Sequence, residues 1–501
     1  MKRQISVSIH TLIAIFVAVI YGLVYTLSIV IGKNTNLYFV SLLGLLLLIY
    51  VCLSWKRTYY RFFSPYIVVF ITLFLTLCGQ ALVWAFGLDA GYRDLRYVAY
   101  YAVRFSNDGI ARALLFSYVC ICVMHVVVIN SVSSRTRKTK EKKVHNKKQE
   151  DMEQANRITN TMDKNLYHII AVFGLALILM SMPFYVISNF SQYLVIKAAG
   201  YGAQYENVSY GISSIGGKIG DFFPVGVITL LFAWGKRNVF NRCNYGVKAT
   251  VAYLLVATYL FMELRLSQRT GVMLFAIAIV FVFYTNKKMP QKLCFLLIVV
   301  GLAAMVAMRM IDLLRRGYIY DLSDFIAYAM DEENNAVLDF LGDIGWNLMT
   351  TVKFQEVIPD IRNYGFGASY LISLTSIIPN LNFWDVHPAY RYGNISVWLQ
   401  SYLGMSFGIG CTPVAEAYYN FGHMGFFVFI IWGMLTVSLN RKFDAPKSAL
   451  DHYHIVLFMG LLLKSFVRSS FFAVFRPYIY YVLMPTMIIK VIYLKMGRRG
   501  T

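Results

Sequence analysis

The sequence is built around long uninterrupted runs of apolar residues, and a chain with such runs has few folds open to it. A helix of about 20 residues crosses the apolar core of a bilayer, and only helices and closed barrels satisfy their backbone hydrogen bonds there. We therefore predict an all-α polytopic membrane protein with about 12 transmembrane helices. The predicted spans are 9–31, 37–55, 63–87, 110–131, 166–188, 221–235, 247–266, 271–285, 293–310, 424–439, 452–472 and 477–494.

The composition agrees with a membrane protein and excludes a soluble one. Only 14% of the 501 residues are charged, too few to cover a soluble surface of this size. The net charge of +22 does not indicate nucleic acid, because nucleic-acid-binding proteins place basic patches on polar, soluble folds. The seven cysteines show neither a disulfide framework nor a zinc spacing.

The distribution of Lys and Arg predicts the orientation of the chain, because short cytoplasmic loops collect basic residues. The loops that share a side with the N-terminus hold 29 basic and seven acidic residues, so the whole excess of +22 lies there. We expect both termini on the cytoplasmic side of the membrane. On the other side 13 of 18 basic residues are Arg, whose planar fork binds phosphate at two points.

This topology divides the chain into five segments. Residues 1–133 form helices 1–4, residues 134–165 form a basic cytoplasmic loop, and residues 166–310 form helices 5–9. Residues 311–423 form a large periplasmic loop, and residues 424–501 form helices 10–12 with a cytoplasmic tail. The apolar stretches of the large loop are too short to span, so we expect short amphipathic helices there.

Two groups of arginines lie near predicted outer ends of spans. Arg265 and Arg269 are four residues apart, which would place them on one helical face at the outer mouth between two spans. Arg309 and Arg316 share a face if their helix continues. Both groups suit a pyrophosphate, since charges at a membrane edge are commonly functional; snorkelling, a salt bridge to Glu263 or interfacial anchoring are the alternatives.

A glycine turn follows Arg362, in the stretch Gly365-Phe366-Gly367 that enters a predicted helix. Free backbone N–H groups in such a turn can bind an anion. The spacing of the two glycines is weak evidence by itself, so Arg362 enters the candidate set as a possible anion ligand beside the turn.

The richest candidate is the helix that Thr412 caps and Pro413 begins. Glu416, Asn420 and His423 follow at helical spacing and would form one polar stripe at the membrane edge. The carboxylate could act as general base or hold a sugar hydroxyl. The alternative is a capped helix whose Glu bonds a neighbouring Arg or a backbone N–H.

Further candidates stand singly. His387 is a possible base, although a lone His is more often structural, and Arg391 follows it in the large loop. Arg468 and Arg476 flank the last outer turn. No metal-binding or nucleotide-binding motif is present in the sequence, so we predict no metal and no cofactor.

Several of these motifs together resemble one family. The stretch from Leu338 to Leu435 is similar to the O-antigen polysaccharide polymerases (Wzy) of bacterial inner membranes, and the resemblance covers roughly residues 255–440. It rests on Asp343-Ile344-Gly345, Val357-Ile358-Pro359, Tyr364-Gly365, Ile378-Pro379-Asn380, Pro413 to Gly422 and Arg269-Thr270-Gly271. The sequence departs from the family at Asp343, where Glu is expected, and at Cys411, where Ser is commoner.

The resemblance implies a metal-independent glycosyltransferase with an architecture like that of the GT-C enzymes. Such polymerases transfer a growing glycan from undecaprenyl pyrophosphate to the non-reducing end of the next lipid-linked repeat unit, at the periplasmic face. Our hypothesis is that Arg269, Arg309 and Arg316 hold the donor pyrophosphate, and that Glu416 and Asn420 orient or deprotonate the acceptor. His387 is the other candidate for the base. The product would be an O-antigen or a capsular polysaccharide, and a flippase and a chain-length regulator would be partners.

Two other functions remain open at this point. An O-antigen ligase has a similar architecture and also uses outer arginines. A flippase or other transporter of lipid-linked oligosaccharide predicts polar residues spread along many spans, whereas here they concentrate at one face.

Overall fold

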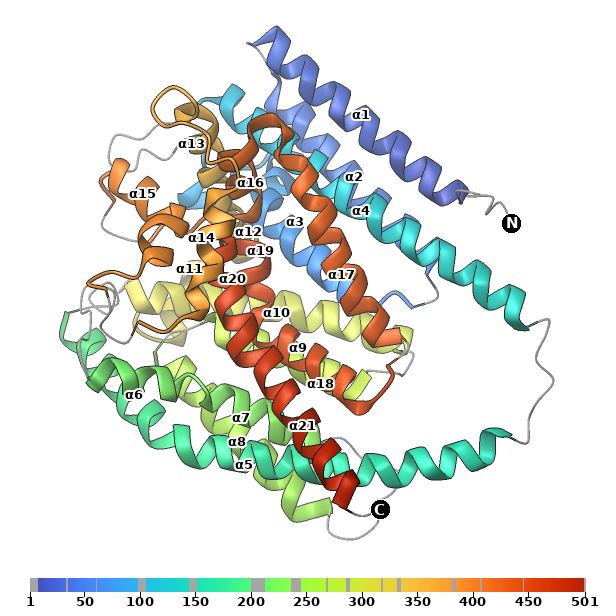
Figure 1. The fold of residues 1–501 in the computed structure, drawn as a ribbon. Helices are drawn as coiled ribbons and strands as arrows, with labels where there is room; N and C mark the ends of the chain where they lie inside the picture. Colours follow the sequence, from blue (N-terminus) through green and yellow to red (C-terminus); the bar gives the residue numbers. More distant parts are fainter. Residues whose placement is uncertain are drawn as a thin grey trace. The chain divides into compact units, whose positions relative to one another are not determined.

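A computed structural model of the chain (Figure 1) describes residues 8–32, 35–59, 61–97, 105–143, 151–199, 212–235, 245–266, 269–284, 289–316, 319–330, 335–380, 384–405, 408–444 and 446–499. Within these ranges every regular element is a helix and no strand is present, which confirms the all-α prediction.

Ten helical segments of the described chain are long and apolar enough to cross a membrane. They match ten of the twelve predicted spans. The other two runs are helical as well, in α9 (Arg269–Tyr284) and α10 (Gln291–Arg316), but their apolar stretches are shorter. One boundary moves: the span predicted from residue 424 begins at Pro413 and runs to Asp444, so it includes the capped helix of the candidate site.

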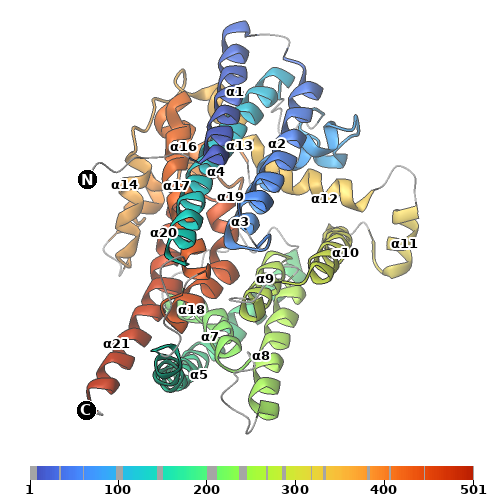
Figure 2. The same cartoon turned by 90° about the vertical axis from the view of Figure 1, so that its right-hand side faces the viewer.

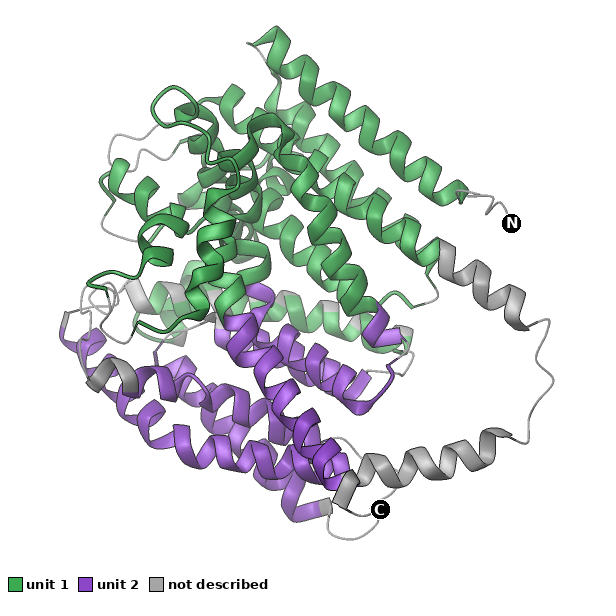
Figure 3. Cartoon of the chain, viewed as in Figure 1, with its two compact units in different colours: residues 1–146, 289–440, 465–476 green, residues 147–288, 441–464, 477–501 purple. Residues whose placement is uncertain are grey.

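The chain folds into two compact units, and each unit is assembled from separate stretches of sequence (Figure 3). Unit 1 contains residues 1–146, 289–440 and 465–476; unit 2 contains residues 147–288, 441–464 and 477–501. The five sequence segments remain a prediction of membrane topology. The basic segment predicted to be cytoplasmic is partly helical, since α4 (Asn107–Lys143) extends into it and α5 (Asp151–Ala199) begins within it.

Unit 1 contains four long N-terminal helices and the short helices of the large loop. Besides α4 and α10, the helices that lie wholly or mostly in this unit are α1 (Ile9–Ile31), α2 (Leu37–Thr58), α3 (Pro65–Trp84), α11 (Leu322–Met330), α12 (Ala336–Gly345), α13 (Met349–Val357), α14 (Ala368–Leu374), α15 (Ile395–Tyr402), α16 (Pro413–Phe421), α17 (Val428–Asp444), α19 (Leu463–Arg468) and α20 (Phe471–Pro477). Helix α4 packs against α1 and α2 (Figure 2). Tyr21 donates to the carbonyl of Leu43 at 2.6 Å and so satisfies its hydroxyl inside an apolar bundle.

Helix α12 of the large loop lies directly on α3, and small residues make this close approach possible. A Cβ on Gly345 would lie 2.5 Å from the backbone nitrogen of Gln80, and one on Gly79 would lie 2.6 Å from the carbonyl oxygen of Leu341. Gln80 donates to the carbonyl of Gly342 at 2.9 Å. Steric fit therefore explains Gly345 of the Asp343-Ile344-Gly345 motif.

The loop after α3 is also attached to α12. Arg93 forms an ion pair with Asp343, and Gln80 donates to the carbonyl of Arg93 at 2.7 Å. The outer end predicted for α3 and the first helices of the large loop therefore form one packed region of unit 1.

Unit 2 is a bundle in which α5 packs on α7, α7 on α8, and α8 on α9. Its other helices are α6 (Ile212–Gly220), α7 (Phe223–Leu230), α8 (Tyr245–Arg265), α18 (Ala449–Leu457) and α21 (Met484–Arg499). A buried hydrogen bond of 2.8 Å between the hydroxyls of Thr229 and Tyr453 joins α7 to α18. A Cβ on Gly226 would lie 2.7 Å from the side chain of Ile178, so close packing fixes α7 on α5.

Candidate functional site

Helix α16 begins as the sequence predicts. Thr412 Oγ1 accepts a hydrogen bond from the backbone N–H of Ala415 at 3.1 Å, and Pro413 is the first helical residue. The N-terminus is buried, and the helix from Pro413 to Asn420 has no exposed residue. Its polar side chains must therefore find partners within the protein.

Glu416 is 1% exposed and both of its carboxylate oxygens are occupied. Ser369 Oγ donates to Oε1 at 2.8 Å, and the backbone N–H of Phe471 donates to Oε2 at 2.6 Å. Hydrogen bonds to both oxygens stabilise a buried carboxyl group that would otherwise be costly to place there. Glu416 thus joins α16 to α14 and to α20.

Asn420 completes this arrangement one turn later and is fully buried. Its amide nitrogen donates to Ser369 Oγ at 2.7 Å and to the carbonyl of Glu416 at 2.9 Å. Its amide oxygen accepts from the backbone N–H of Gly367 at 2.9 Å. Glu416, Ser369 and Asn420 therefore form one buried network, called the Glu416 network below.

The glycine turn before α14 rests on the end of α16. The N–H of Gly365 donates to the carbonyl of Tyr419 at 3.0 Å, and that of Phe366 to the carbonyl of Asn420 at 2.9 Å. A Cβ on Gly365 would lie 2.5 Å from the Tyr419 ring. The prediction that free N–H groups of this turn bind an anion is wrong, because α16 already accepts their hydrogen bonds.

His423 leaves the predicted polar stripe. Gly422 adopts φ 55°, which ends α16, and the chain continues as a 3₁₀ helix (Gly422–Phe427). His423 Nδ1 therefore lies 2.7 Å from the hydroxyl of Tyr25 on α1 rather than beside Asn420. The stripe prediction is correct for Glu416 and Asn420 and wrong for His423, because the helix stops between them.

Arg112 was missed in the sequence and lies in this region. It is half-buried in the first turns of α4, and its charge interacts with Tyr25, Tyr418 and His423. The signal that could have identified it is an Arg at the predicted outer end of an otherwise apolar span.

Arg362 lies against aromatic rings at the same helix. Its guanidinium carbon is 4.4 Å from the ring centre of Trp398 and 5.2 Å from that of Tyr419. Cation–π contacts of this kind orient a guanidinium and leave its N–H groups at the edge available. Arg391 is exposed and lies over the neighbouring Tyr392 ring at 5.5 Å.

Arg468 precedes and Arg476 follows Phe471 in the sequence, and the backbone N–H of Phe471 donates to Glu416. Arg468 Nε donates to Asn347 Oδ1 at 2.7 Å, which connects this segment to the large loop, and Arg476 is half-buried near the end of α20. The Glu416 network thus connects segments that contain three of the candidate arginines, namely Arg362, Arg468 and Arg476.

The family model of the O-antigen polysaccharide polymerase Wzy matches residues 9–498. The chain belongs to this family. It is a multi-pass membrane protein that polymerises O-antigen repeat units, a glycosyltransferase-type activity. No curated protein and no solved structure matches the chain. The match extends the resemblance found at roughly residues 255–440 to almost the whole polymerase.

Arg309 of this polymerase is a buried ion pair and not an open anion ligand. It is 6% exposed, and its Nη2 lies 2.9 Å from Asp339 Oδ2 and donates to Tyr328 Oη at 2.9 Å. Tyr328 in turn donates to Asp339 at 2.7 Å. Arg309 and Arg316 do lie on one continuous helix, α10, but the side chain of Arg316 is outside the described residues.

Arg265 and Arg269 do not share a helical face, so that prediction is wrong. Helix α8 ends at Arg265 and α9 begins at Arg269, because the chain turns between the two spans. The Arg265 guanidinium lies 3.8 Å from the ring centre of Tyr193, and Glu263 accepts from Tyr185 at 2.8 Å. The side chain of Arg269 is outside the described residues.

Both ring nitrogens of His387 bond the backbone. The N–H of Ala389 donates to Nδ1 at 3.0 Å, and Nε2–H donates to the carbonyl of Ile378 at 3.0 Å. These two bonds hold two parts of the large loop together. In the portion of the polymerase that the structure describes, no group of three His, Cys, Asp or Glu side chains could hold a metal ion.

Proposed function

We propose that the chain extends undecaprenyl-pyrophosphate-linked glycans at the periplasmic face of the bacterial inner membrane. The growing glycan moves from its lipid pyrophosphate to the non-reducing end of the next lipid-linked repeat unit. The observation that supports this most directly is the Glu416 network, because it fixes three arginine-bearing segments around the helix with the most specific family motif.

The reaction breaks the bond between the anomeric carbon and the pyrophosphate oxygen, and forms one between that carbon and an acceptor hydroxyl oxygen. The hydroxyl proton leaves and the lipid pyrophosphate departs as an anion. Fixed cations stabilise this developing charge. Arg362 and Arg112 are our candidates for direct contact, since neither has a carboxylate partner among the described residues.

Glu416 acts in this proposal as a positioning residue and not as the base. A base must reach the acceptor hydroxyl, whereas Glu416 is buried and both oxygens already accept hydrogen bonds. His423 is the better candidate for the base, because it is exposed and bonds Tyr25 through Nδ1 only. The tautomer with Nδ1–H donating to Tyr25 leaves the Nε2 lone pair available for the proton.

Reconstitution tests this function. Purified protein in liposomes that contain the host's lipid-linked repeat unit should produce glycan ladders, and Arg112→Ala and His423→Ala should each reduce ladder formation at least 100-fold. Full-length ladders from both variants at normal protein levels would contradict the assigned roles.

A deletion strain separates the proposal from the competing functions. Loss of the polymerase leaves single repeat units attached to lipid A core. A strain that accumulates polymer on the undecaprenyl carrier would instead indicate a ligase. Movement of lipid-linked units across liposomes by the purified protein, without ladders, would indicate a transporter.

A further inference from the structure

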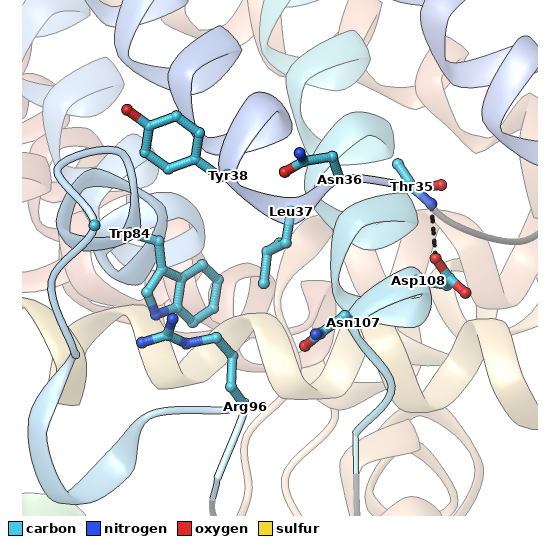
Figure 4. Close-up of a pocket in the computed structure, with 9 residues that line it drawn as sticks. Thr35, Asn36, Leu37, Tyr38, Trp84, Arg96, Asn107 and Asp108 are labelled. Carbon is cyan, nitrogen blue, oxygen red and sulfur yellow. Dashed lines mark hydrogen bonds between the residues drawn. The ribbon is translucent and has the colours of Figure 1, made fainter.

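A cavity of about 530 Å³ lies in unit 1, where α2 and α4 begin and α3 ends (Figure 4). Its volume is within the range of small-molecule sites, about 300–1,000 Å³. None of the residues discussed so far as catalytic or pyrophosphate-binding lines this cavity. The lining residues are Thr35, Asn36, Leu37, Tyr38, Trp84, Gly87, Arg96, Asn107 and Asp108.

One wall of the cavity is fixed by a buried carboxylate behind it. Asp94 Oδ2 accepts from Trp84 Nε1 at 2.9 Å, from the N–H of Ala90 at 2.8 Å and from Arg96 Nη2 at 2.7 Å. The Arg96 guanidinium lies 5.4 Å from the Trp84 ring centre, and Figure 4 shows the two side by side. Trp84 and Arg96 are thus held in place without a ligand.

Other lining residues retain polar atoms that have no partner among the described residues. Asp108 Oδ1 accepts from the N–H of Thr35 at 2.9 Å, which leaves Oδ2 available. The Asn107 amide has no hydrogen-bond partner among the described residues, and Tyr38 has half of its surface (50%) exposed. A carboxylate oxygen, an amide and an aromatic ring therefore line one space.

The charges of this region exclude a phosphate ligand. Arg96 is the one cation that lines the described cavity wall, and it already forms ion pairs with Asp94 and Asp89. Asp108 adds a further negative charge. An anion would meet uncompensated carboxylates, whereas a neutral polyhydroxyl compound would not.

A sugar ring matches the carboxylate, the amide and the aromatic ring that line the cavity. Adjacent hydroxyls donate to a carboxylate and exchange hydrogen bonds with an amide, and the apolar C–H face of a pyranose can pack on a tyrosine ring. We propose that this cavity is a saccharide subsite that holds part of a repeat unit away from its pyrophosphate. The identity of the glycan as a repeat unit rests on the proposed function.

The position of the cavity agrees with that role. The loop that contributes Arg96 is attached to α12 of the large loop through the ion pair between Arg93 and Asp343. The start of α4 also approaches α13, since a Cβ on Gly109 would lie 3.3 Å from Glu356 Oε1. The cavity therefore belongs to the end of unit 1 where the large loop packs.

Binding of a pyrophosphate-free glycan tests the subsite directly. The probe is the host's repeat-unit oligosaccharide, released from its lipid by mild acid, with the full chain in nanodiscs and calorimetry or saturation-transfer NMR as readout. We expect binding that Tyr38→Ala and Asn107→Ala each weaken at least five-fold. Inorganic pyrophosphate should not compete. Phe39→Ala is the matched control, since Phe39 adjoins Tyr38 on α2 and does not line the cavity.

Three results would overturn the subsite. In the first, the unmodified chain does not bind the oligosaccharide. In the second, both cavity variants bind it as tightly as the unmodified chain does. In the third, pyrophosphate displaces it. Melting temperatures of the variants show whether they are folded, and Tyr38→Phe, which keeps the ring, should bind more tightly than Tyr38→Ala. Ladder formation is measured on the same preparations. If the unmodified chain forms ladders and the cavity variants bind the oligosaccharide as tightly as it does, the subsite is rejected and the proposed function is not. If the unmodified chain forms no ladders, the proposed function is rejected.

Discussion

The backbone N–H of Phe471 donates to Glu416 Oε2 across 2.6 Å, so the start of α20 is fixed on the buried face of α16. Every substitution at position 471 except proline keeps this backbone donor, so the carboxylate is the partner that mutation can readily change. This contact makes Glu416 a connection between helices, in agreement with the alternative in which its carboxylate bonds a backbone N–H.

Glu416→Gln should retain much of the activity and Glu416→Ala should lose it. Glutamine can still accept from Phe471 and bond Ser369, whereas alanine leaves buried polar groups unsatisfied at about 1–3 kcal/mol each. Loss of two such bonds predicts a fall of about 100-fold or more in ladder formation by the Ala variant. Equal loss of activity in both variants, with normal folding, would show that the carboxylate itself takes part in proton transfer.

Gly345→Ala should destabilise unit 1. The new methyl group would meet the backbone of α3, and overpacking costs about 1–3 kcal/mol, or roughly 2–10 °C in melting temperature. Gly22→Ala on α1 is the matched control, because its Cβ would have no neighbour within 4 Å. It should melt at or above the temperature of the unmodified chain, and a comparable fall in both variants would contradict the steric explanation.

Asp94→Asn should lower stability at neutral pH and matter less in acid. Burial alone would raise the pKa of Asp94, but hydrogen bonds from Arg96, Ala90 and Trp84 outweigh it and lower the pKa. A depressed pKa stabilises the fold above the usual carboxyl value of about 3.9, and that stabilisation is lost as pH falls through the folded-state pKa. The difference in melting temperature between the two chains should therefore shrink from pH 7 toward pH 3. The exposed ion-pair partner in Asp89→Asn should have a smaller effect.

Trp398→Ala should reduce activity through Arg362. Cation–π contacts contribute about 0.5–2 kcal/mol, which corresponds to a fall of about 2- to 30-fold in rate if the guanidinium must be held in place. Trp398→Phe keeps an aromatic face and should lose less. A ladder assay over a range of donor concentrations separates weaker donor binding from a slower reaction, and identical kinetics in the Ala variant would remove Arg362 from the site.

The predicted orientation can be tested by cysteine labelling in intact cells. A membrane-impermeant maleimide should label Ile361→Cys, which is exposed in the large loop, above the level of the parent chain. It should label Lys447→Cys, on the side predicted to be cytoplasmic, only after the membrane is permeabilised. The reverse pattern would invert the topology.

Local features of this chain were predictable because they depend on neighbours in sequence. Apolar runs gave the spans, and Thr412 followed by Pro413 gave the start of α16, since capping needs only a side chain and the next N–H groups. The end of the same helix was not predicted. Gly422 and its positive φ turn His423 toward Tyr25, a partner almost 400 positions away.

Partners in tertiary structure decided the other differences. Arg309 resembled an open ligand until Asp339 and Tyr328 were found beside it, and the glycine turn resembled an anion site until its N–H groups were found on α16. Arg265 and Arg269 were separated by a turn that a continuous helical spacing conceals. Periodicity identifies a candidate residue but not the group that already occupies it.

The packing of α12 on α3 also has a consequence for biosynthesis. About 250 residues separate the end of α3 from the start of α12. At a synthesis rate of about 5–20 residues per second, α12 emerges roughly 12–50 s after α3. During that interval the α3 surface around Gly79 has no α12 to cover it, so lipid, another helix or an insertion factor must occupy the place until α12 has been synthesised.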